Sequence, residues 1–158
     1  MSFDATTTPS VGDATKLNDF TRLRDNDRAN AGRSYFLGGS LTTYISDTSY
    51  VDLTAEYLEW EIDGTHLPGL TVYLEVNVRA HHDNSGTVTV SVQLYNVTTG
   101  AAVASSEVAV AGLAAGARSR SKSSAITLAT GVNVYKAQIK TSDAAKRVSA
   151  VALLSIRY

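Results

Sequence analysis

The sequence predicts an all-β protein, a jelly-roll-like antiparallel β-sandwich with a short N-terminal helical arm. Apolar and polar residues alternate through most of residues 34–158, which is the spacing of strands that bury one face. Segments that favour turns, such as TTGA, GLAAG, ATG and SDAAK, separate these stretches. Many short antiparallel strands without a second helix favour two packed sheets. We therefore divide the chain into an arm, residues 1–33, and a β-sandwich domain, residues 34–158.

The arm differs from the rest of the chain in charge and in apolar spacing. Residues 1–34 hold five cations and five carboxylates, so this segment has no net charge and does not resemble a basic tail for nucleic acid. Apolar residues recur every three positions at Leu17, Phe20 and Leu23, which predicts a helix over about residues 14–27. An isolated helix of this length is marginal in water, so the stripe requires a surface to pack on. That surface is either the chain's own β-domain or another subunit.

The strongest strand pattern lies in the middle of the chain. Residues 70–78 and residues 88–94 both alternate, and the turn-forming segment HHDNSG lies between them, which predicts a hairpin. Trp60, the only tryptophan, is on an inward alternating position and is expected in the core. Further strands are predicted at residues 35–45, 50–53, 58–62, 102–110, 123–128, 132–141 and 148–157.

Composition excludes several classes of function. The chain contains no cysteine, so disulfides, thiolate catalysis and Cys-ligated metal centres are ruled out. A net charge of −1 lacks the electrostatic signature of a general nucleic-acid binder. The longest apolar runs are shorter than a membrane-spanning helix, and the N-terminus has no signal-peptide pattern. We expect no nucleic-acid partner, no membrane insertion and no cofactor.

Two groups of residues could carry chemistry. His81, His82 and Asp83 are adjacent, but neighbouring strand residues point to opposite faces, so a solvated turn is the better interpretation and no metal is assigned. Glu59 and Glu61 share a strand face at a spacing compatible with glycoside hydrolysis. Alternating glutamates on a wet strand face produce the same pattern without any pocket, so we expect no enzymatic activity.

Three other features concern surfaces. Cations at every second position of residues 118–122 are typical of an edge strand, where charge discourages unwanted pairing. Asn96 opens a glycosylation sequon that we interpret as a turn. Tyrosines alternate with core positions, and their rings could contact a sugar or a partner subunit; the residues singled out are Tyr57, Tyr73 and Tyr95.

Two stretches resemble virion proteins of tailed bacteriophages. Residues 11–26, VGDATKLNDFTRLRDN, resemble a short N-terminal pattern of tail, fibre and baseplate-associated proteins, and the positions that carry the likeness are Gly12, Asp13, Asn18, Leu23, Asp25 and Asn26. The segments SVQLYNVTTGAAVASSEV, ITLATGVNVYKAQIKTS and VALLSIRY resemble small jelly-roll domains of phage appendage and capsid-decorating proteins.

The resemblance implies a non-enzymatic virion structural protein, either tail- or fibre-associated or a capsid decoration protein. It implies contact with other virion proteins, assembly as a homo-oligomer with a trimer favoured, and a location in the virion after assembly in the host cytoplasm. In this interpretation Leu17, Phe20 and Leu23 make the anchoring or subunit contact. The alternative is a carbohydrate- or host-receptor-binding module that uses exposed tyrosines.

Overall fold

The structure, a computed structural model, describes residues 34–53, 59–67 and 69–157. The predicted arm helix with Leu17, Phe20 and Leu23, and the candidate contact residue Tyr57, lie outside the described residues. Within them, no helix is long and apolar enough to cross a bilayer.

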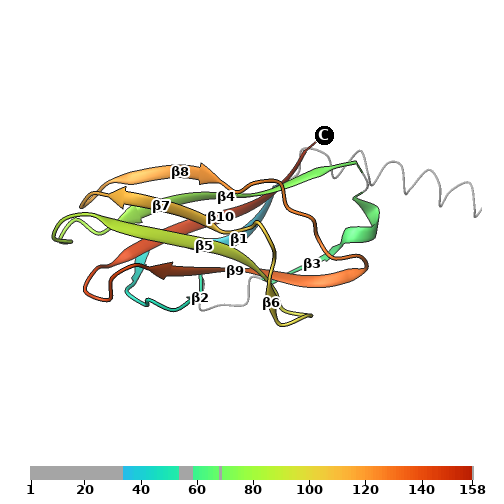
Figure 1. Cartoon of the computed structure of the whole chain (residues 1–158), viewed down its shortest axis with the longest axis horizontal. Coiled ribbons are helices and arrows are strands. Elements are labelled where there is room, and N and C mark those ends of the chain that lie inside the picture. Colours follow the sequence, from blue (N-terminus) through green and yellow to red (C-terminus); the bar gives the residue numbers. More distant parts are fainter. Residues whose placement is uncertain (1–33, 54–58, 68, 158) are drawn as a thin grey trace, which may run out of the picture.

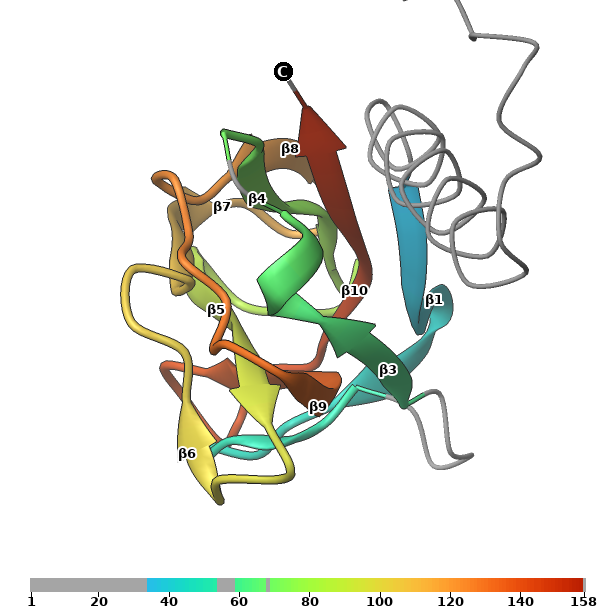
Figure 2. The same cartoon turned by 90° about the vertical axis from the view of Figure 1, so that its right-hand side faces the viewer.

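The described chain forms two antiparallel sheets packed face to face (Figure 1). Figure 2 views the strands from one end and shows the two layers. The elements are β1 (Ser34–Ile45), β2 (Val51–Asp52), β3 (Trp60–Asp63), the 3-10 helix η1 (Gly64–His66), β4 (Thr71–Ala80), β5 (Val88–Asn96), β6 (Ala101–Ala102), β7 (Val108–Leu113), β8 (Arg118–Lys122), β9 (Val132–Thr141) and β10 (Val148–Arg157).

The strand order is that of a jelly roll. Sheet A has the order β1-β10-β4-β8, and sheet B has the order β2-β9-β5-β6, with β3 also paired to β9 and β7 also paired to β5. β2 and β3 both pair with β9, and β6 and β7 both pair with β5, so each of these two pairs can be counted as one strand. The sandwich then has eight strands in chain order. The first pairs with the eighth, the second with the seventh, the third with the sixth and the fourth with the fifth. This nested pairing is the double Greek key of jelly-roll sandwiches. The predicted antiparallel β-sandwich is therefore confirmed.

The core lies between the sheets and follows the period-two pattern. On β4, the inward side chains of Val72, Leu74, Val76 and Val78 are all buried. They face inward residues of sheet B such as Tyr135, which is also fully buried. Burying one leucine of this kind contributes about 1.5–3 kcal/mol, so the alternating pattern supplies the main stabilising term of the fold.

The predicted hairpin between residues 70–78 and 88–94 is wrong. β4 lies in sheet A between β10 and β8, whereas β5 lies in sheet B beside β9. The HHDNSG segment therefore crosses from one sheet to the other, a separation of about 10 Å in sandwiches. Both strands bury one face in either arrangement, so alternation alone does not distinguish a hairpin from a crossover between layers.

Two other predicted strands differ from the structure. The strand expected at residues 102–110 is split into β6 and β7, and Ser105 between them has a positive φ of 61°. The strand expected at residues 123–128 does not form; this segment contributes one isolated bridge, between Ile126 and Val72. The charged segment before it forms β8, an edge strand of sheet A, which confirms the edge-strand interpretation.

Strand β1 contains a bulge that depends on glycine. The register against β10 shifts between Phe36 and Gly38, and Leu37 is buried at that point. Gly39 has φ of +94°, and a Cβ built there would lie 2.1 Å from the carbonyl oxygen of Ala150. Only glycine lets the bulged strand approach β10 this closely.

Candidate functional site

The outer face of sheet A gathers positive charge from three strands. On β4 the outward residues alternate with buried valines, and the register pairs Glu75 with Lys122 and Asn77 with Arg120. Residues opposite each other in a ladder point to the same face. The outward cations of this face, which we call the cationic face, are Arg79 of β4, Arg118, Arg120 and Lys122 of β8, and Arg157 of β10.

Glu75 is the one carboxylate among the described outward residues of the cationic face, and it is already engaged. It accepts hydrogen bonds from Ser155 Oγ at 2.7 Å and from Arg157 at 2.6 Å. These bonds hold the pKa of Glu75 below its ordinary value. A general acid needs a raised pKa, so Glu75 is poorly suited to that role.

A hollow of about 230 Å³ lies on the cationic face over β4. It combines polar and apolar lining; the residues are Glu75, Val76, Asn77, Arg120, Ser121, Val151 and Leu153. An adjoining shallow hollow extends to Lys122 and Arg157. The Glu75 carboxylate in this lining is paired with Arg157, whereas the Arg120 guanidinium has no ion pair among the described residues. With one amide and an apolar wall beside Arg120, the hollow can accept a small polar group that carries negative charge.

The candidate tyrosines Tyr73 and Tyr95 are placed on opposite sides of the sandwich. Tyr73 is outward on β4 of sheet A, and Lys122 Nζ lies 4.5 Å from its ring centroid. Tyr95 is outward on β5 of sheet B, where Lys136 Nζ lies 5.7 Å from its ring centroid. The two rings are half-buried and do not form one continuous platform.

The outer face of sheet B is polar and internally bonded. Gln93 Nε2 donates to Gln138 Oε1 at 3.0 Å, and Asp52 accepts from Gln138 Nε2 at 3.1 Å and from Lys136 Nζ at 2.7 Å. Partial burial raises the pKa of Asp52, but the hydrogen bonds from Lys136 and Gln138 outweigh it and the pKa is lowered. The hydrogen bond to Asp52 in turn raises the pKa of Lys136. Gln93, Gln138, Asp52 and Lys136 thus form one connected polar network on this face.

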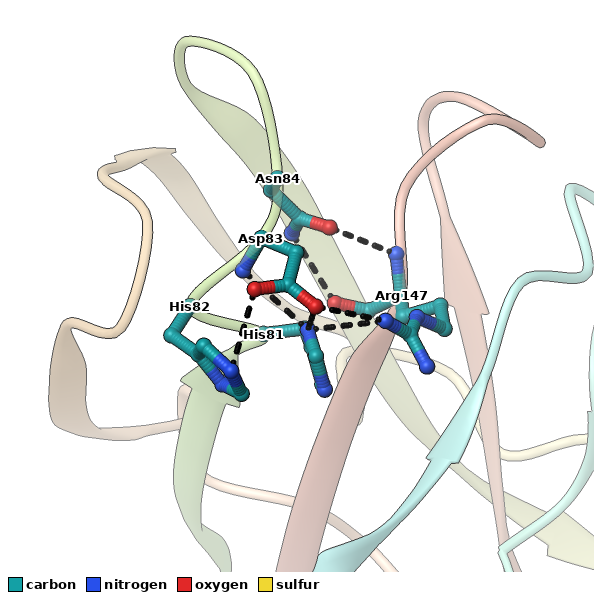
Figure 3. Close-up of polar contacts among 5 residues, drawn as sticks. All are labelled: His81, His82, Asp83, Asn84 and Arg147. Carbon is teal, nitrogen blue, oxygen red and sulfur yellow. Dashed lines mark hydrogen bonds and ion pairs between the residues drawn. The ribbon is translucent and has the colours of Figure 1, made fainter.

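A second polar cluster lies where the chain crosses from sheet A to sheet B (Figure 3). His81 Nδ1 lies 3.1 Å from the Arg147 guanidinium and accepts the backbone N–H of Asp83 at 3.2 Å. Arg147 also donates to Asp83 at 3.2 Å, and His82 Nε2 lies 3.0 Å from the other oxygen of that carboxylate. Asn84 Nδ2 donates to the Arg147 carbonyl, and its Oδ1 accepts the Arg147 N–H, both at 2.9 Å.

These contacts fasten the crossover to the turn before β10. The His81 N–H donates to the Arg147 carbonyl at 2.9 Å, and the His81 ring packs edge-on against Tyr44 of β1. Burial lowers the pKa of His81, and the neighbouring Arg147 and His82 lower it further. The imidazole therefore stays neutral near pH 7, with Nδ1 as a hydrogen-bond acceptor.

The cluster contains atoms that could ligate a metal ion, but the positively charged Arg147 side chain already contacts them. Ligand atoms of His81, His82 and Asp83 lie within 4.8 Å of one another. The Arg147 guanidinium contacts both His81 Nδ1 and Asp83 Oδ2, so a divalent ion would have to displace it. The third histidine, His66, belongs to η1 and follows β3. The arrangement favours a structural polar network, in line with the interpretation of this segment as a turn.

The glutamates considered for hydrolysis are not brought together with Glu75. Glu61 is exposed on β3 of sheet B, and Glu59 is exposed just before that strand, whereas Glu75 belongs to sheet A. None of the three described hollows includes Glu59 or Glu61.

The sequon residue Asn96 is 4% exposed and fully engaged. Its Nδ2 donates to Asn133 Oδ1 at 3.1 Å, and its Oδ1 accepts the Thr99 N–H at 3.1 Å. An amide used in this way orders the turn after β5, as the turn interpretation requires.

The cationic face is a feature that the sequence reasoning missed. The alternating cations of residues 118–122 were visible as a strand signal, but Arg79 and Arg157 lie far from them in the chain. The cations of these three strands come together only because β4 pairs with both β8 and β10.

No protein-family model matches the sequence, and no curated protein matches it. Among solved structures, a carbohydrate-binding module, CBM36, in complex with calcium and xylotriose is similar over 78% of this chain and 98% of its own, with 16% identity and a TM-score of 0.43. A structure of infectious bursal disease virus Gx strain is similar over 80% of this chain, with 18% identity and a TM-score of 0.46. This chain spans 30% of the length of that viral chain. Neither likeness assigns a function.

Proposed function

We propose that this chain is a non-enzymatic structural subunit of a bacteriophage virion, attached to the particle through residues 1–33. The observation that carries the proposal is that the described residues form two sheets with a shared core. Both sheets and the core between them are built from residues 34–157. Attachment is a role that suits the mixed charge of residues 1–33.

The absence of enzymatic activity is part of the proposal. Glu75 is held by Arg157 and Ser155, and the His81 imidazole is held by Arg147. Groups that already bond to fixed partners are poorly placed to exchange protons with a substrate. Support for the phage context comes from the sequence resemblance of residues 11–26 and of the last strands.

Within this proposal, the partners are other virion proteins and further copies of the chain. The subunit would be tail- or fibre-associated or would decorate the capsid, as a homo-oligomer for which the resemblance favours a trimer. It would reside in the virion after assembly in the host cytoplasm, without a nucleic-acid partner, a membrane or a cofactor.

The test is deletion of residues 1–33. The truncated protein should keep a cooperative thermal transition and a β-rich circular dichroism spectrum, and it should fail to co-sediment with particles assembled in its presence. A matched control replaces Leu17, Phe20 and Leu23 by serine in the full chain, which removes the stripe and keeps the arm's length and charge. Normal incorporation of the truncated protein would contradict the proposal, and cryo-EM of labelled particles would separate capsid from tail.

A second candidate is a carbohydrate- or host-receptor-binding module. The observation that favours it is the outward placement of Tyr73 and Tyr95 beside amide and charged groups. Glycan-array binding that is lost in Tyr73→Ala or Tyr95→Ala would support this function. Tyr57→Ala belongs in the same series. An array that is negative for wild type would count against it.

A further inference from the structure

The cationic face carries a charge imbalance that the chain as a whole does not. The described outer face of sheet A carries five cations and one carboxylate, whereas the whole chain has a net charge of −1. Clustering of one sign beside a hollow concentrates ligands of the opposite sign. The imbalance therefore points to an anionic partner.

Two of these cations have no ion pair, side-chain hydrogen bond or ring contact among the described residues. Within the part of the chain that the structure describes, no carboxylate forms an ion pair with Arg118 or Arg120, and both are exposed. By contrast, Lys122 lies over the Tyr73 ring and Arg157 pairs with Glu75. Arg118 and Arg120 are thus free to bind something outside the fold.

Arg118 also lies directly opposite another cation. The β4–β8 register pairs it with Arg79, whose NH1 donates to the Leu41 carbonyl at 3.3 Å. Like charges directly opposite in an antiparallel ladder are destabilising. A bound anion between them would remove this cost.

The hollow next to Arg120 has a mixed chemistry that fits a sugar. Asn77 offers an amide for hydroxyl groups, and Val151 and Leu153 of β10 supply an apolar wall. Sugar rings present C–H groups on one face and hydroxyls at their rim. A guanidinium binds a carboxylate through two parallel hydrogen bonds.

We propose that the cationic face binds an acidic polysaccharide, a chain of uronic or sialic acid units. The carboxylate of one unit pairs with Arg120, its ring lies against Val151 and Leu153, and a neighbouring carboxylate meets Arg118. Alternate residues of β8 are about 6.6 Å apart along the strand, so the two arginines form a straight row that a linear polyanion can follow.

Other polyanions fit less well. Single-stranded nucleic acid needs open aromatic rings for base stacking, and the Tyr73 ring carries Lys122 at 4.5 Å. An acidic protein needs a larger flat contact than one hollow of about 230 Å³ provides. This inference goes beyond the proposed structural role and does not depend on attachment through the arm.

The experiment measures binding of the full chain by isothermal titration calorimetry at low salt. The probes are the tetramers of galacturonic acid, hyaluronan and sialic acid, and the matched neutral probes are the methyl esters of the same tetramers. A 12-mer of deoxythymidine and a hexaglutamate peptide represent the competing classes. At least one acidic sugar should bind, its methyl ester should not, and affinity should fall as salt increases.

The variants separate this site from general charge attraction. Arg120→Gln should weaken binding at least tenfold, since it removes a charge-assisted pair. The matched control is Lys140→Gln, which removes one positive charge from β9 of sheet B and should change affinity less than twofold. Thermal melts of each variant verify folding, because Arg120 is exposed but Lys140 is half-buried with its Nζ 4.3 Å from the Tyr50 ring centroid.

Three outcomes would overturn the proposal: no binding to any acidic sugar, equal binding of the methyl ester, or equal losses in Arg120→Gln and Lys140→Gln. Tighter binding of the oligonucleotide or the peptide than of every sugar would reassign the face to that class of partner. Incorporation into particles is not measured here, so failure of this inference leaves the structural proposal to be judged by its own test.

Discussion

The Trp60 indole Nε1 donates a hydrogen bond of 2.6 Å to the carbonyl oxygen of Phe36. Trp60 belongs to β3 of sheet B, and Phe36 belongs to β1 of sheet A. The indole also packs edge-on against Tyr35, with ring centroids 5.3 Å apart. One side chain thus joins the two sheets at the edge of the sandwich, and it is half-buried against the core.

We expect Trp60→Phe to lower the free energy of unfolding by about 1 kcal/mol, the usual contribution of one hydrogen bond, plus a smaller loss of packing. The measurement is urea denaturation followed by circular dichroism, because the substitution removes the only tryptophan. Trp60→Leu, which also removes the aromatic contact with Tyr35, should be worse. Unchanged stability in both variants would mean that β3 is not fastened through this residue.

The bulge in β1 predicts that replacing glycine by alanine destabilises the protein much more at Gly39 than at a glycine with open space around it. Gly39→Ala should lower the free energy of unfolding by about 3 kcal/mol or more, since the new Cβ would meet the Ala150 carbonyl at 2.1 Å and φ is +94°. Gly112→Ala is the matched control: its φ is +67°, with nothing within 4 Å of the new Cβ, so only backbone strain of about 1 kcal/mol applies. Thermal melts compare the two, and equal losses would show that the close approach of β1 to β10 is not a constraint.

The His81 cluster predicts that the protein becomes less stable at acidic pH. The pKa of His81 is lowered in the fold, so below pH of about 6.5 the unfolded chain takes up a proton that the folded chain does not. The free energy of unfolding should therefore fall as pH drops from about 6.5 toward the pKa of the folded state. His81→Asn, whose Oδ1 can replace Nδ1 as an acceptor, should flatten this part of the profile.

The control for that profile is His82→Asn, because His82 is exposed. It should keep most of the wild-type slope when urea midpoints are compared at pH 7.5 and pH 5.0, because burial and Arg147 still lower the pKa of His81. Other charged groups around His81, namely Arg79, His82, Asp83 and Arg147, stay in place in the His81 variant. A wild-type slope in His81→Asn would assign the acid sensitivity to another group.

The like-charge pair of Arg79 and Arg118 predicts a stabilising substitution. Arg118→Gln should raise the free energy of unfolding by a few tenths of a kcal/mol at low salt, because it removes repulsion across the β4–β8 ladder. The gain should shrink as salt increases, since these side chains are near the surface. A loss of stability that is independent of salt would show that the Arg118 side chain stabilises the fold by packing and that its repulsion with Arg79 is minor.

Alternation identified most strands but not their partners. The residues of β4, β5, β9 and β10 were predicted within a few positions because Val, Leu and Ile at every second residue fix which face is buried. The same pattern serves a hairpin or a crossover, so β4 and β5 were wrongly paired. β10 has apolar residues on both faces, and it lies inside sheet A between β1 and β4.

The candidate contact residues were also predicted only as far as the local pattern allows. That Tyr73 and Tyr95 point outward follows from their neighbours in the sequence, but that they lie on different sheets follows from strand order. The spacing of Arg118 and Arg120 was visible locally, whereas the hollows that Arg120 shares with Leu153 and Arg157 depend on contacts between distant segments. Chemistry that several strands assemble is not encoded in any one of them.

The position of β10 also constrains how this protein is made. It is the last strand of the chain, and it pairs on one side with β1 and on the other with β4. Sheet A therefore cannot be completed on the ribosome until β10 has been translated, and β1 must wait unpaired for a partner more than a hundred residues later. Such long-range pairing folds slowly and leaves strand edges open to neighbouring chains. Nascent copies made close together are consequently at risk of exchanging their first or last strands.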